Sequence, residues 1–412
     1  MAPNNMEMIE KEIIKQIISA FPETYTIECE VRYNEGRVFD AIIYYKTIPY
    51  VLVEIKDSEQ NFQQTTKYLL RGKKIVNSYW SMVTNGSTCR LNGGASLDFM
   101  TYSLDEALKR IKDIKSVIDG MDTTNFAGVT GIFAKYDYGE FANDLELVPA
   151  ANAQPYITYK SKESERYLFE KIIKEKFNSY KGELHKYTSL QTLFESIKTN
   201  SYRLNGLAGM NDKSEGYYWD EAVNGTKQVP KETINDYFIS SFSTKKDNLT
   251  LWRLYGNDGK GVCLTFQLKT SFNRDSMVLS KVKYVEKDNN CFKLFKELME
   301  NNFIFQDIEQ WKCLFKPLEY EDEDEYRLIL RDKGDKVLVK EKDYYMMNDS
   351  SIINSYVTFD MNHVDFPLEL KKITLGPKCP EQQVNIIQIV HLLKVSGFSG
   401  VEVNESSVKT YR

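Results

Sequence analysis

The chain has 412 residues, of which 42% are hydrophobic and 27% charged, so it is long enough for two or three folded domains and too apolar to be disordered. Its formal net charge of −5 does not predict nucleic-acid binding over the whole surface, so phosphate contacts would have to come from a local basic patch. No apolar run approaches the ~20 residues that span a bilayer, and six scattered cysteines contain no Cys-x-x-Cys pair. These features argue against a membrane protein, a disulfide framework and a zinc knuckle, and they favour a cytoplasmic location.

The first predicted element is an amphipathic helix over residues 6–20. Its apolar residues Ile9, Ile13 and Ile17 recur at helical spacing and predict one buried face. Glu10 lies beside this apolar stripe. Two interpretations of Glu10 stay open, because the carboxylate either completes a metal site or is simply solvated.

The segment 38–68 is the most informative part of the chain. Asp40 lies on one apolar run, and Glu54-Ile55-Lys56 closes a second run. Alternation along a strand places Glu54 and Lys56 on the same face. A carboxylate pair can hold Mg²⁺ or Mn²⁺, which activates water and neutralises charge on a scissile phosphate, and a lysine adds a compact positive charge beside it. This pattern predicts metal-dependent cleavage of nucleic acid.

The same residues resemble the PD-(D/E)xK nuclease superfamily, and in detail the amino-terminal region of type I restriction motor subunits. The resemblance covers roughly residues 5–115, although the first acid follows Phe39 instead of proline. It implies a restriction-endonuclease-like α/β sandwich with a metal held by Asp40, Glu54 and Glu10. The implied catalytic residues are Asp40, Glu54, Lys56, Gln64 and Tyr68, of which the last two follow the lysine at the distance seen in RecB-like members. A domain of this shape that only binds nucleic acid or a partner protein is the alternative.

A basic stretch and a change in composition follow the motif. Arg71-Gly-Lys73-Lys74 is either a phosphate-binding patch or a solvated helix end. A helix predicted over residues 104–118 closes the first domain, 1–119. Residues 120–180 lack strong periodicity, and we expect them to form a linker and a connecting helix.

Residues 181–412 are expected to form a second, mixed α+β domain. Their separated motifs are similar, in order and spacing, to the domain-of-unknown-function family DUF2971. The motifs are Leu184–Leu190, Asn211-Asp212, Phe238–Ser243, Leu251–Tyr255, Gly261–Phe266, Val282–Tyr284, Tyr320–Arg327 and Ile373–Pro377, followed by a predicted helix over Glu381–Val395. Asn211-Asp212 either binds a ligand or makes a turn.

The arrangement also resembles a divergent ADP-ribosyltransferase. This resemblance implies NAD as the cofactor and Glu325 as the carboxylate that bonds the ribose 2′-hydroxyl and stabilises an oxocarbenium-like centre. The implied cofactor contacts are Lys186 or His185, Tyr187, Ser241, Ser243, Tyr255 and Arg327. Phe242, Ser243 and Trp252 have an alternative interpretation as core and turn residues of a sheet.

The leading hypothesis is an anti-phage defence or toxin-type protein. In it, a Mg²⁺-dependent nuclease domain cleaves or binds nucleic acid and is fused to a domain that binds a nucleotide or NAD. One alternative places an ADP-ribosyltransferase in the second domain and leaves nucleic-acid recognition to the first. Another is a non-enzymatic recognition component that works with partner proteins of a defence system. No Gly-x-x-x-x-Gly-Lys-Ser/Thr motif occurs, so a P-loop motor is not expected.

Overall fold

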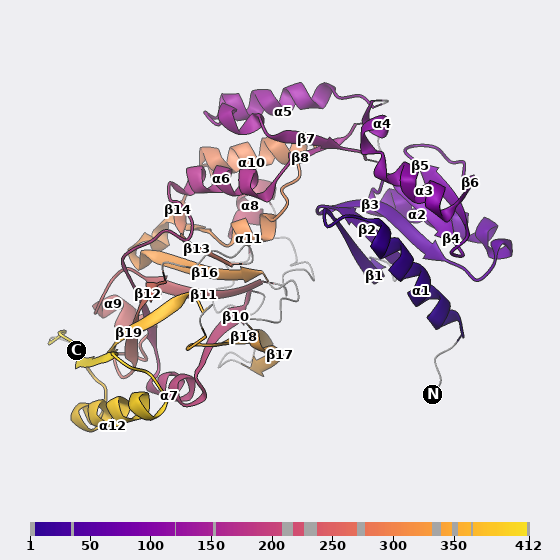
Figure 1. The fold of residues 1–412 in the computed structure, drawn as a ribbon. Helices are drawn as coiled ribbons and strands as arrows, with labels where there is room; N and C mark the ends of the chain where they lie inside the picture. The colour runs from indigo at the N-terminus through magenta and orange to yellow at the C-terminus, as the bar shows by residue number, and fades with distance from the viewer. Residues whose placement is uncertain are drawn as a thin grey trace. The chain divides into compact units, whose positions relative to one another are not determined.

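The computed structural model describes residues 5–33, 37–119, 121–150, 154–207, 217–225, 237–269, 277–331, 339–347, 353–363 and 366–409 (Figure 1). The protein is a mixed α+β structure with several sheets, which confirms the predicted class. The chain divides into two compact units. Unit 1 comprises residues 1–168 and 294–307, and unit 2 comprises residues 169–293 and 308–412. The predicted Asn211-Asp212 motif lies outside the described residues.

Unit 1 is built on a six-stranded sheet with the strand order β1-β2-β3-β4-β5-β6. Neighbouring strands are antiparallel except β3 and β4, which are parallel and are joined through helix α2. The strands are β1 (Tyr25–Tyr33), β2 (Arg37–Tyr45), β3 (Ile48–Ile55), β4 (Trp80–Thr84), β5 (Thr88–Gly93) and β6 (Met100–Ser103). The helices around them are α1 (Asn5–Ala20), the short η2 (Glu59–Asn61), α2 (Phe62–Val76), α3 (Leu104–Lys112) and α4 (Ile114–Ile118).

Helices cover both faces of this sheet. α1 and α3 pack on one face, in a core that includes Ile13, Val53 and Ile55. α2 packs on the other face, in a core that includes Leu52 and Leu69. Because successive residues of β3 belong to opposite cores, Glu54 lies on the α2 face. The result is the three-layer α/β sandwich that the sequence predicts for this region.

The segment predicted as a linker and a connecting helix, 120–180, contains more secondary structure than that one helix. It forms α5 (Thr124–Lys135), η3 (Gly139–Ala142), the hairpin β7 (Leu145–Val148) and β8 (Tyr156–Tyr159), and α6 (Lys162–Ile173). Within unit 1, Phe133 packs edge-on against Phe303, and Lys135 pairs with Glu297 at 2.6 Å. These partners come from a segment far later in the sequence, so local periodicity could not indicate them.

Unit 2 contains a ten-stranded sheet with the order β17-β18-β10-β11-β9-β12-β19-β20, and β16 and β13 extend from β11. Among the described residues, β11 pairs with β9 through Ser243 and His185 alone, and with β10 through two residue pairs. β9 and β10 therefore pair with different parts of β11 and diverge from each other along it. The strands are β9 (Glu183–Thr188), β10 (Ser201–Gly206), β11 (Tyr237–Ser243), β12 (Val262–Leu268), β13 (Met277–Lys281), β16 (Glu325–Arg331), β17 (Val339–Met347), β18 (Ile353–Asp360), β19 (Leu368–Leu375) and β20 (Glu402–Glu405).

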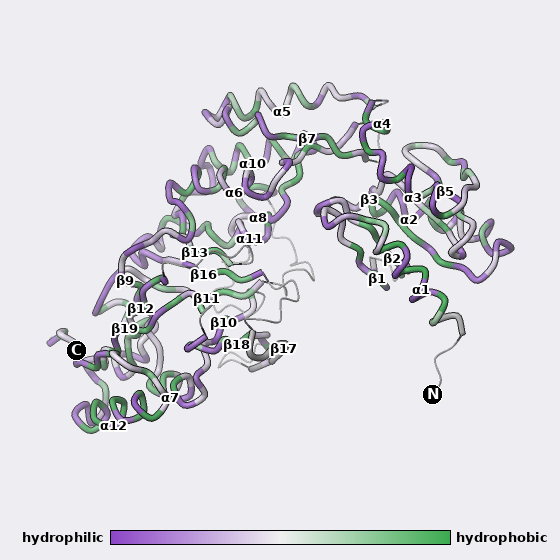
Figure 2. The backbone as a smooth tube through the Cα atoms, in the orientation of Figure 1, coloured by the Kyte–Doolittle hydropathy of each residue, from purple (hydrophilic) through white to green (hydrophobic). Residues whose placement is uncertain are grey.

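A large apolar core lies against this sheet (Figure 2), and β16 is buried along most of its length although it contains Glu325 and Arg327. The remaining elements are α7 (Leu190–Thr199), α8 (Tyr218–Asn224), α9 (Leu249–Leu254), α10 (Asn290–Glu300), α11 (Ile308–Lys312), η6 (Leu318–Glu323), α12 (Gln382–Val395) and the parallel pair β14 (Lys283–Val285) and β15 (Phe315–Pro317). All six cysteines lie in the described part of the chain and are free thiols. None of the described helices is both long and apolar enough to cross a membrane.

Candidate functional site

The structure brings Asp40, Glu54 and Lys56 together at the end of β3. The Lys56 ammonium donates to Glu54 Oε2 at 2.9 Å and to the Ile55 carbonyl at 2.8 Å, and it lies 3.5 Å from Asp40 Oδ2. The backbone N–H of Ile55 donates to the same Asp40 oxygen at 2.6 Å. Three oxygen atoms from two adjacent strands therefore converge on one cationic group.

The local backbone explains how Asp40 reaches this position. The pairing of β1 with β2 passes from Cys29–Ala41 to Val31–Phe39, and it is interrupted at Asp40. The residue across from the interruption, Glu30, has a φ of 53°, in the left-handed region. This irregularity leaves Asp40 free of regular pairing, so its carboxylate can accept from the end of β3.

The electrostatics of Glu54 are unusual for a glutamate. The side chain is buried, and burial together with the charge of Asp40 raises its pKa to about 7, although Lys56 opposes the shift. The pKa of Lys56 is raised even though burial alone would lower it, because both carboxylates favour the ammonium. Glu54 Oε1 is buried and has no hydrogen-bond donor among the described residues. The site therefore holds more negative charge than one lysine satisfies.

A divalent cation fits this donor set. In the described ranges, no group of three or more His, Cys, Asp or Glu side chains could hold a metal. At this site the protein ligands would therefore be the carboxylates of Asp40 and Glu54 and the carbonyl oxygen of Ile55. Oxygen donors of this kind suit Mg²⁺ and Mn²⁺. The unpartnered oxygen of Glu54 supports the fit, because a cation would complete its contacts.

The predicted third metal ligand, Glu10, is not part of this cluster. Glu10 is half-buried on α1, and α1 packs on the face of the sheet opposite to Glu54. None of the contacts of Asp40, Glu54 and Lys56 within the described chain involves Glu10. The resemblance implied Glu10 as a ligand, but the packing of α1 on the other face of the sheet does not bring it to Asp40 and Glu54.

The two residues predicted on α2 differ in their surroundings. Gln64 is exposed. Tyr68 donates its hydroxyl proton to the carbonyl of Val38 at 2.7 Å, and its ring packs 5.5 Å from that of Phe39. Tyr68 therefore fixes α2 to β2 directly before Asp40. This position suits a supporting role for Tyr68.

The basic stretch after Tyr68 is smaller than the sequence indicates. Lys73 is buried, donates to Asn92 Oδ1 at 2.6 Å and has a pKa that burial lowers to about 7. Arg71 and Lys74 are exposed. A phosphate-binding patch on α2 would thus use these two residues.

Unit 2 contains a cavity of about 770 Å³ where β9 and β10 diverge along β11. It includes residues from both faces of the sheet because the strands separate there. Seven of the eight residues named for this site line it: His185, Lys186, Tyr187, Ser241, Ser243, Tyr255 and Glu325. The sequence thus pointed to residues that lie together around one cavity.

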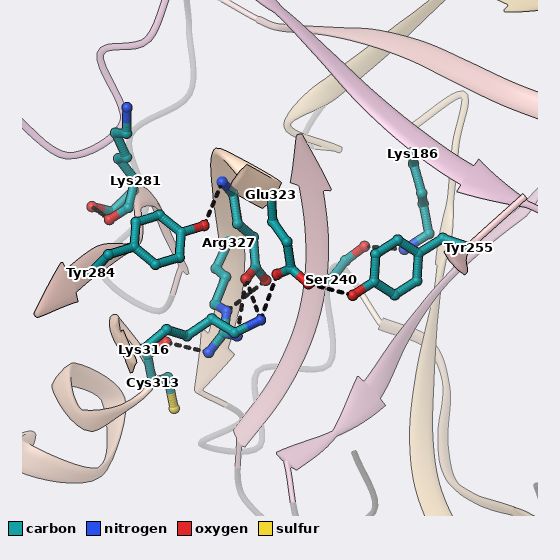
Figure 3. A network of polar contacts seen from close by, with 11 residues as sticks. Lys186, Ser240, Tyr255, Lys281, Tyr284, Cys313, Lys316, Glu323 and Arg327 are labelled. Atoms are coloured by element: carbon teal, nitrogen blue, oxygen red, sulfur yellow. Dashed lines mark hydrogen bonds and ion pairs between the residues drawn. The ribbon is translucent and has the colours of Figure 1, made fainter. Parts of the chain in front are cut away.

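Glu325 is held by two buried cations. Arg327 donates to its carboxylate at 2.8 and 3.2 Å, and Lys316 donates to it at 3.1 Å and to Glu323 at 2.7 Å (Figure 3). Burial alone would raise the pKa of Glu325, but the charges of Arg327 and Lys316 lower it. The carboxylate is therefore ionised at neutral pH.

Arg327, predicted as a cofactor contact, has a different place. Its side chain is fully buried, and it also donates to the Cys313 carbonyl at 2.5 Å. It is not among the residues that line the cavity. Arg327 holds the Glu325 carboxylate, and its own guanidinium is covered by the segment around Cys313.

The cavity lining includes both alternatives on β9, His185 and Lys186, and of the two it is Lys186 that has the partly exposed side chain. Its ammonium donates to Ser240 Oγ at 2.7 Å, and Tyr202 bonds the same hydroxyl at 2.7 Å. Burial lowers the pKa of Lys186 to about 8, partly offset by Glu325. His185 is instead buried against Thr265 at 3.1 Å, and burial lowers its pKa to about 4.

The two predicted stacking tyrosines also differ. Tyr187 has a structural role, because its hydroxyl donates to the Lys245 carbonyl and its ring packs edge-on against Trp252. Tyr255 is half exposed and donates to Glu323 at 2.5 Å. The prediction missed several lining residues, namely Lys316, Tyr320, Arg203, Asn205 and Asn354. They come from separate parts of the sequence, and no local pattern groups them.

Comparison with known proteins identifies one segment of the chain. Residues 251–328 match a family model described as "Protein of unknown function (DUF2971)". The segment contains Tyr255, Lys316 and Glu325 of the cavity. No curated protein and no solved structure shows significant similarity to the chain. The predicted resemblance to DUF2971 is confirmed for this segment, and the nuclease resemblance of unit 1 finds no support in these comparisons.

Proposed function

We propose that unit 1 is a metal-dependent phosphodiester hydrolase, a nuclease of the PD-(D/E)xK type. One observation carries this proposal. Asp40, Glu54 and the Ile55 carbonyl converge around the Lys56 ammonium at the end of β3. Its substrate would be nucleic acid, bound in part through exposed Arg71 and Lys74 on α2.

Asp40 and Lys56 have different roles in the proposed hydrolysis, and each role follows from the chemistry of the side chain. A bound Mg²⁺ or Mn²⁺ would supply an activated water and neutralise charge on the scissile phosphate. Asp40 is oriented by the Ile55 N–H, so its carboxylate is fixed before the cation binds. Lys56 has a raised pKa and stays protonated, so it can stabilise negative charge on the attacked phosphate.

The test is cleavage of labelled double-stranded DNA, single-stranded DNA and RNA by the purified full chain with Mg²⁺ or Mn²⁺. Lys56→Ala should abolish cutting without unfolding the protein. The matched control is Lys109→Ala, which removes an exposed lysine from α3 on the opposite face of the sheet. Metal-independent cutting that Lys56→Ala leaves unchanged would refute the assignment.

A second candidate function is ADP-ribosyl transfer from NAD in unit 2. The observation that favours it is an ionised Glu325 in the same cavity as Lys186, Ser241 and Ser243. A carboxylate in that position can stabilise positive charge that develops on a ribose as nicotinamide leaves. In this alternative, unit 1 recognises nucleic acid and unit 2 modifies the target.

Labelled NAD provides the test of this second function. Transfer of label to a target should stop in Glu325→Gln and persist in Glu321→Gln, which changes an exposed glutamate of η6. Absence of labelling in any lysate component would count against transfer. If Lys56→Ala and Glu325→Gln both keep full protection against phage, the protein acts in defence as a non-enzymatic recognition component.

A further inference from the structure

Two asparagine side chains in the unit 2 cavity have an unsatisfied acceptor. The amide oxygens of Asn205 and Asn354 are buried and have no hydrogen-bond donor among the described residues. Asn354 is only 7% exposed. Buried carbonyl oxygens are almost always paired, because an unpaired one loses its bond to water without replacement. A ligand that brings N–H or O–H donors would satisfy both.

The fold places the two amides side by side. Asn205 of β10 is opposite Tyr356 of β18, and Asn354 lies two residues from Tyr356 on the same strand. Residues in this diagonal relation share one face of the sheet with Cα atoms about 7–8 Å apart. Gly206 makes room for Asn354, since a Cβ there would lie 3.1 Å from Asn354 Oδ1. The pair is therefore built by the β10–β18 register.

A cation without a counter-ion lines the same cavity. In the described part of the chain, Lys186 has a neutral polar partner, Ser240, and lies near the ring faces of Tyr202 and Phe242 at 5.7 and 5.5 Å. The nearby charge of Glu325 is already paired with Arg327 and Lys316. A partly buried ammonium that lacks an anion favours a ligand that supplies one.

We infer that this cavity binds a nucleotide whose phosphate pairs with Lys186 and whose base presents an amino group to Asn205 and Asn354. Adenine and cytosine nucleotides have this chemistry, and the volume of about 770 Å³ admits a mononucleotide or a larger one. The half-exposed ring of Tyr255 offers a stacking surface in the same cavity. The inference rests on the cavity proposed above for NAD, but it does not require transfer of ADP-ribose.

Calorimetry on the full chain with AMP, IMP and adenosine tests this inference. IMP replaces the amino group of AMP by an oxygen, and adenosine lacks the phosphate. We expect AMP to bind at least about tenfold more tightly than either, because each analogue leaves a buried group unpaired. Affinity for AMP should fall as pH rises through the pKa of Lys186, near 8.

Two variants separate the two ends of the site. Asn354→Leu should bind AMP and IMP equally, and Lys186→Met should bind AMP no better than adenosine, whereas Lys186→Arg should restore part of the preference. Lys198→Met, an exposed lysine of α7, serves as the control. Equal binding of all three probes to the wild type, or binding of none, would overturn the inference. Selective AMP binding by a protein that transfers nothing from NAD would support it and reject the transferase.

Discussion

Replacing Glu54 by glutamine should stabilise unit 1 at pH 8 when no divalent cation is present. Glu54 is 5% exposed, and its pKa of about 7 lies above the ordinary 4.5, first because of burial and then because of Asp40. The folded protein therefore keeps a proton that the unfolded chain has released between pH 4.5 and 7. Stability is highest below this window and falls as pH rises through it. Glutamine imitates the protonated form and should remove the loss.

The size of the effect follows from the shift in pKa. Each pKa unit is worth about 1.4 kcal/mol, so a shift from 4.5 to about 7 corresponds to about 3 kcal/mol of stability at pH 8. With Mg²⁺ present, the wild type should become more stable than Glu54→Gln. Mg²⁺ should stabilise the wild type, where an ionised Glu54 gains a partner, and stabilise the variant much less.

Hydrogen exchange measured by mass spectrometry on the full chain can measure this difference in stability within unit 1. Peptides from β3 and β4 should be protected more strongly in Glu54→Gln than in the wild type at pH 8, and equally at pH 4.5 after correction for intrinsic exchange. Glu59→Gln, an exposed glutamate of η2, is the control and should change little. Equal protection of wild type and Glu54→Gln at pH 8 would refute the reasoning.

Substitutions at three further positions test other contacts. Tyr68→Phe loses the hydroxyl bond to the Val38 carbonyl, so unit 1 should be about 1 kcal/mol less stable in denaturant and cut its substrate more slowly. Arg327→Met leaves Glu325 with Lys316 alone and should destabilise unit 2 by about 3–5 kcal/mol, and Arg327→Lys by less. Gly206→Ala would place a methyl carbon 2.3 Å from a hydroxyl of β18, which should cost about 1–3 kcal/mol and weaken selectivity for AMP. Unchanged unfolding midpoints would contradict the contact concerned.

The candidate metal site was predictable because its geometry is local. Asp40 and Glu54 lie on strands adjacent in sequence, and alternation along β3 fixes the face that Glu54 and Lys56 share. The sequence left the role of Glu10 open, because the position of a helical side chain depends on which face of the sheet the helix covers. The burial of Lys73 could not be predicted for a similar reason, because its partner Asn92 comes from another element. Such choices are made by packing between distant elements.

Unit 2 shows the same division between local and distant information. The resemblance to ADP-ribosyltransferases implied Lys186, Ser241 and Ser243 from short local motifs, and all three line the cavity. The pairing of Asn205 with Asn354 depends on the register of β10 with β18, strands far apart in the sequence. Arg327 was misplaced because the element that covers it, around Cys313, could not be positioned from the sequence.

The proposed metal site at Asp40 and Glu54 is tested most directly by Mn²⁺ binding to the purified full chain, followed by electron paramagnetic resonance. If Asp40 and Glu54 seat the catalytic cation, the wild type should bind Mn²⁺ with a signal that broadens on addition of nucleic acid. Asp40→Asn with Glu54→Gln should lose that bound ion and all cutting, while the secondary structure stays unchanged. Mn²⁺ binding of equal stoichiometry and affinity in the double variant would contradict the account.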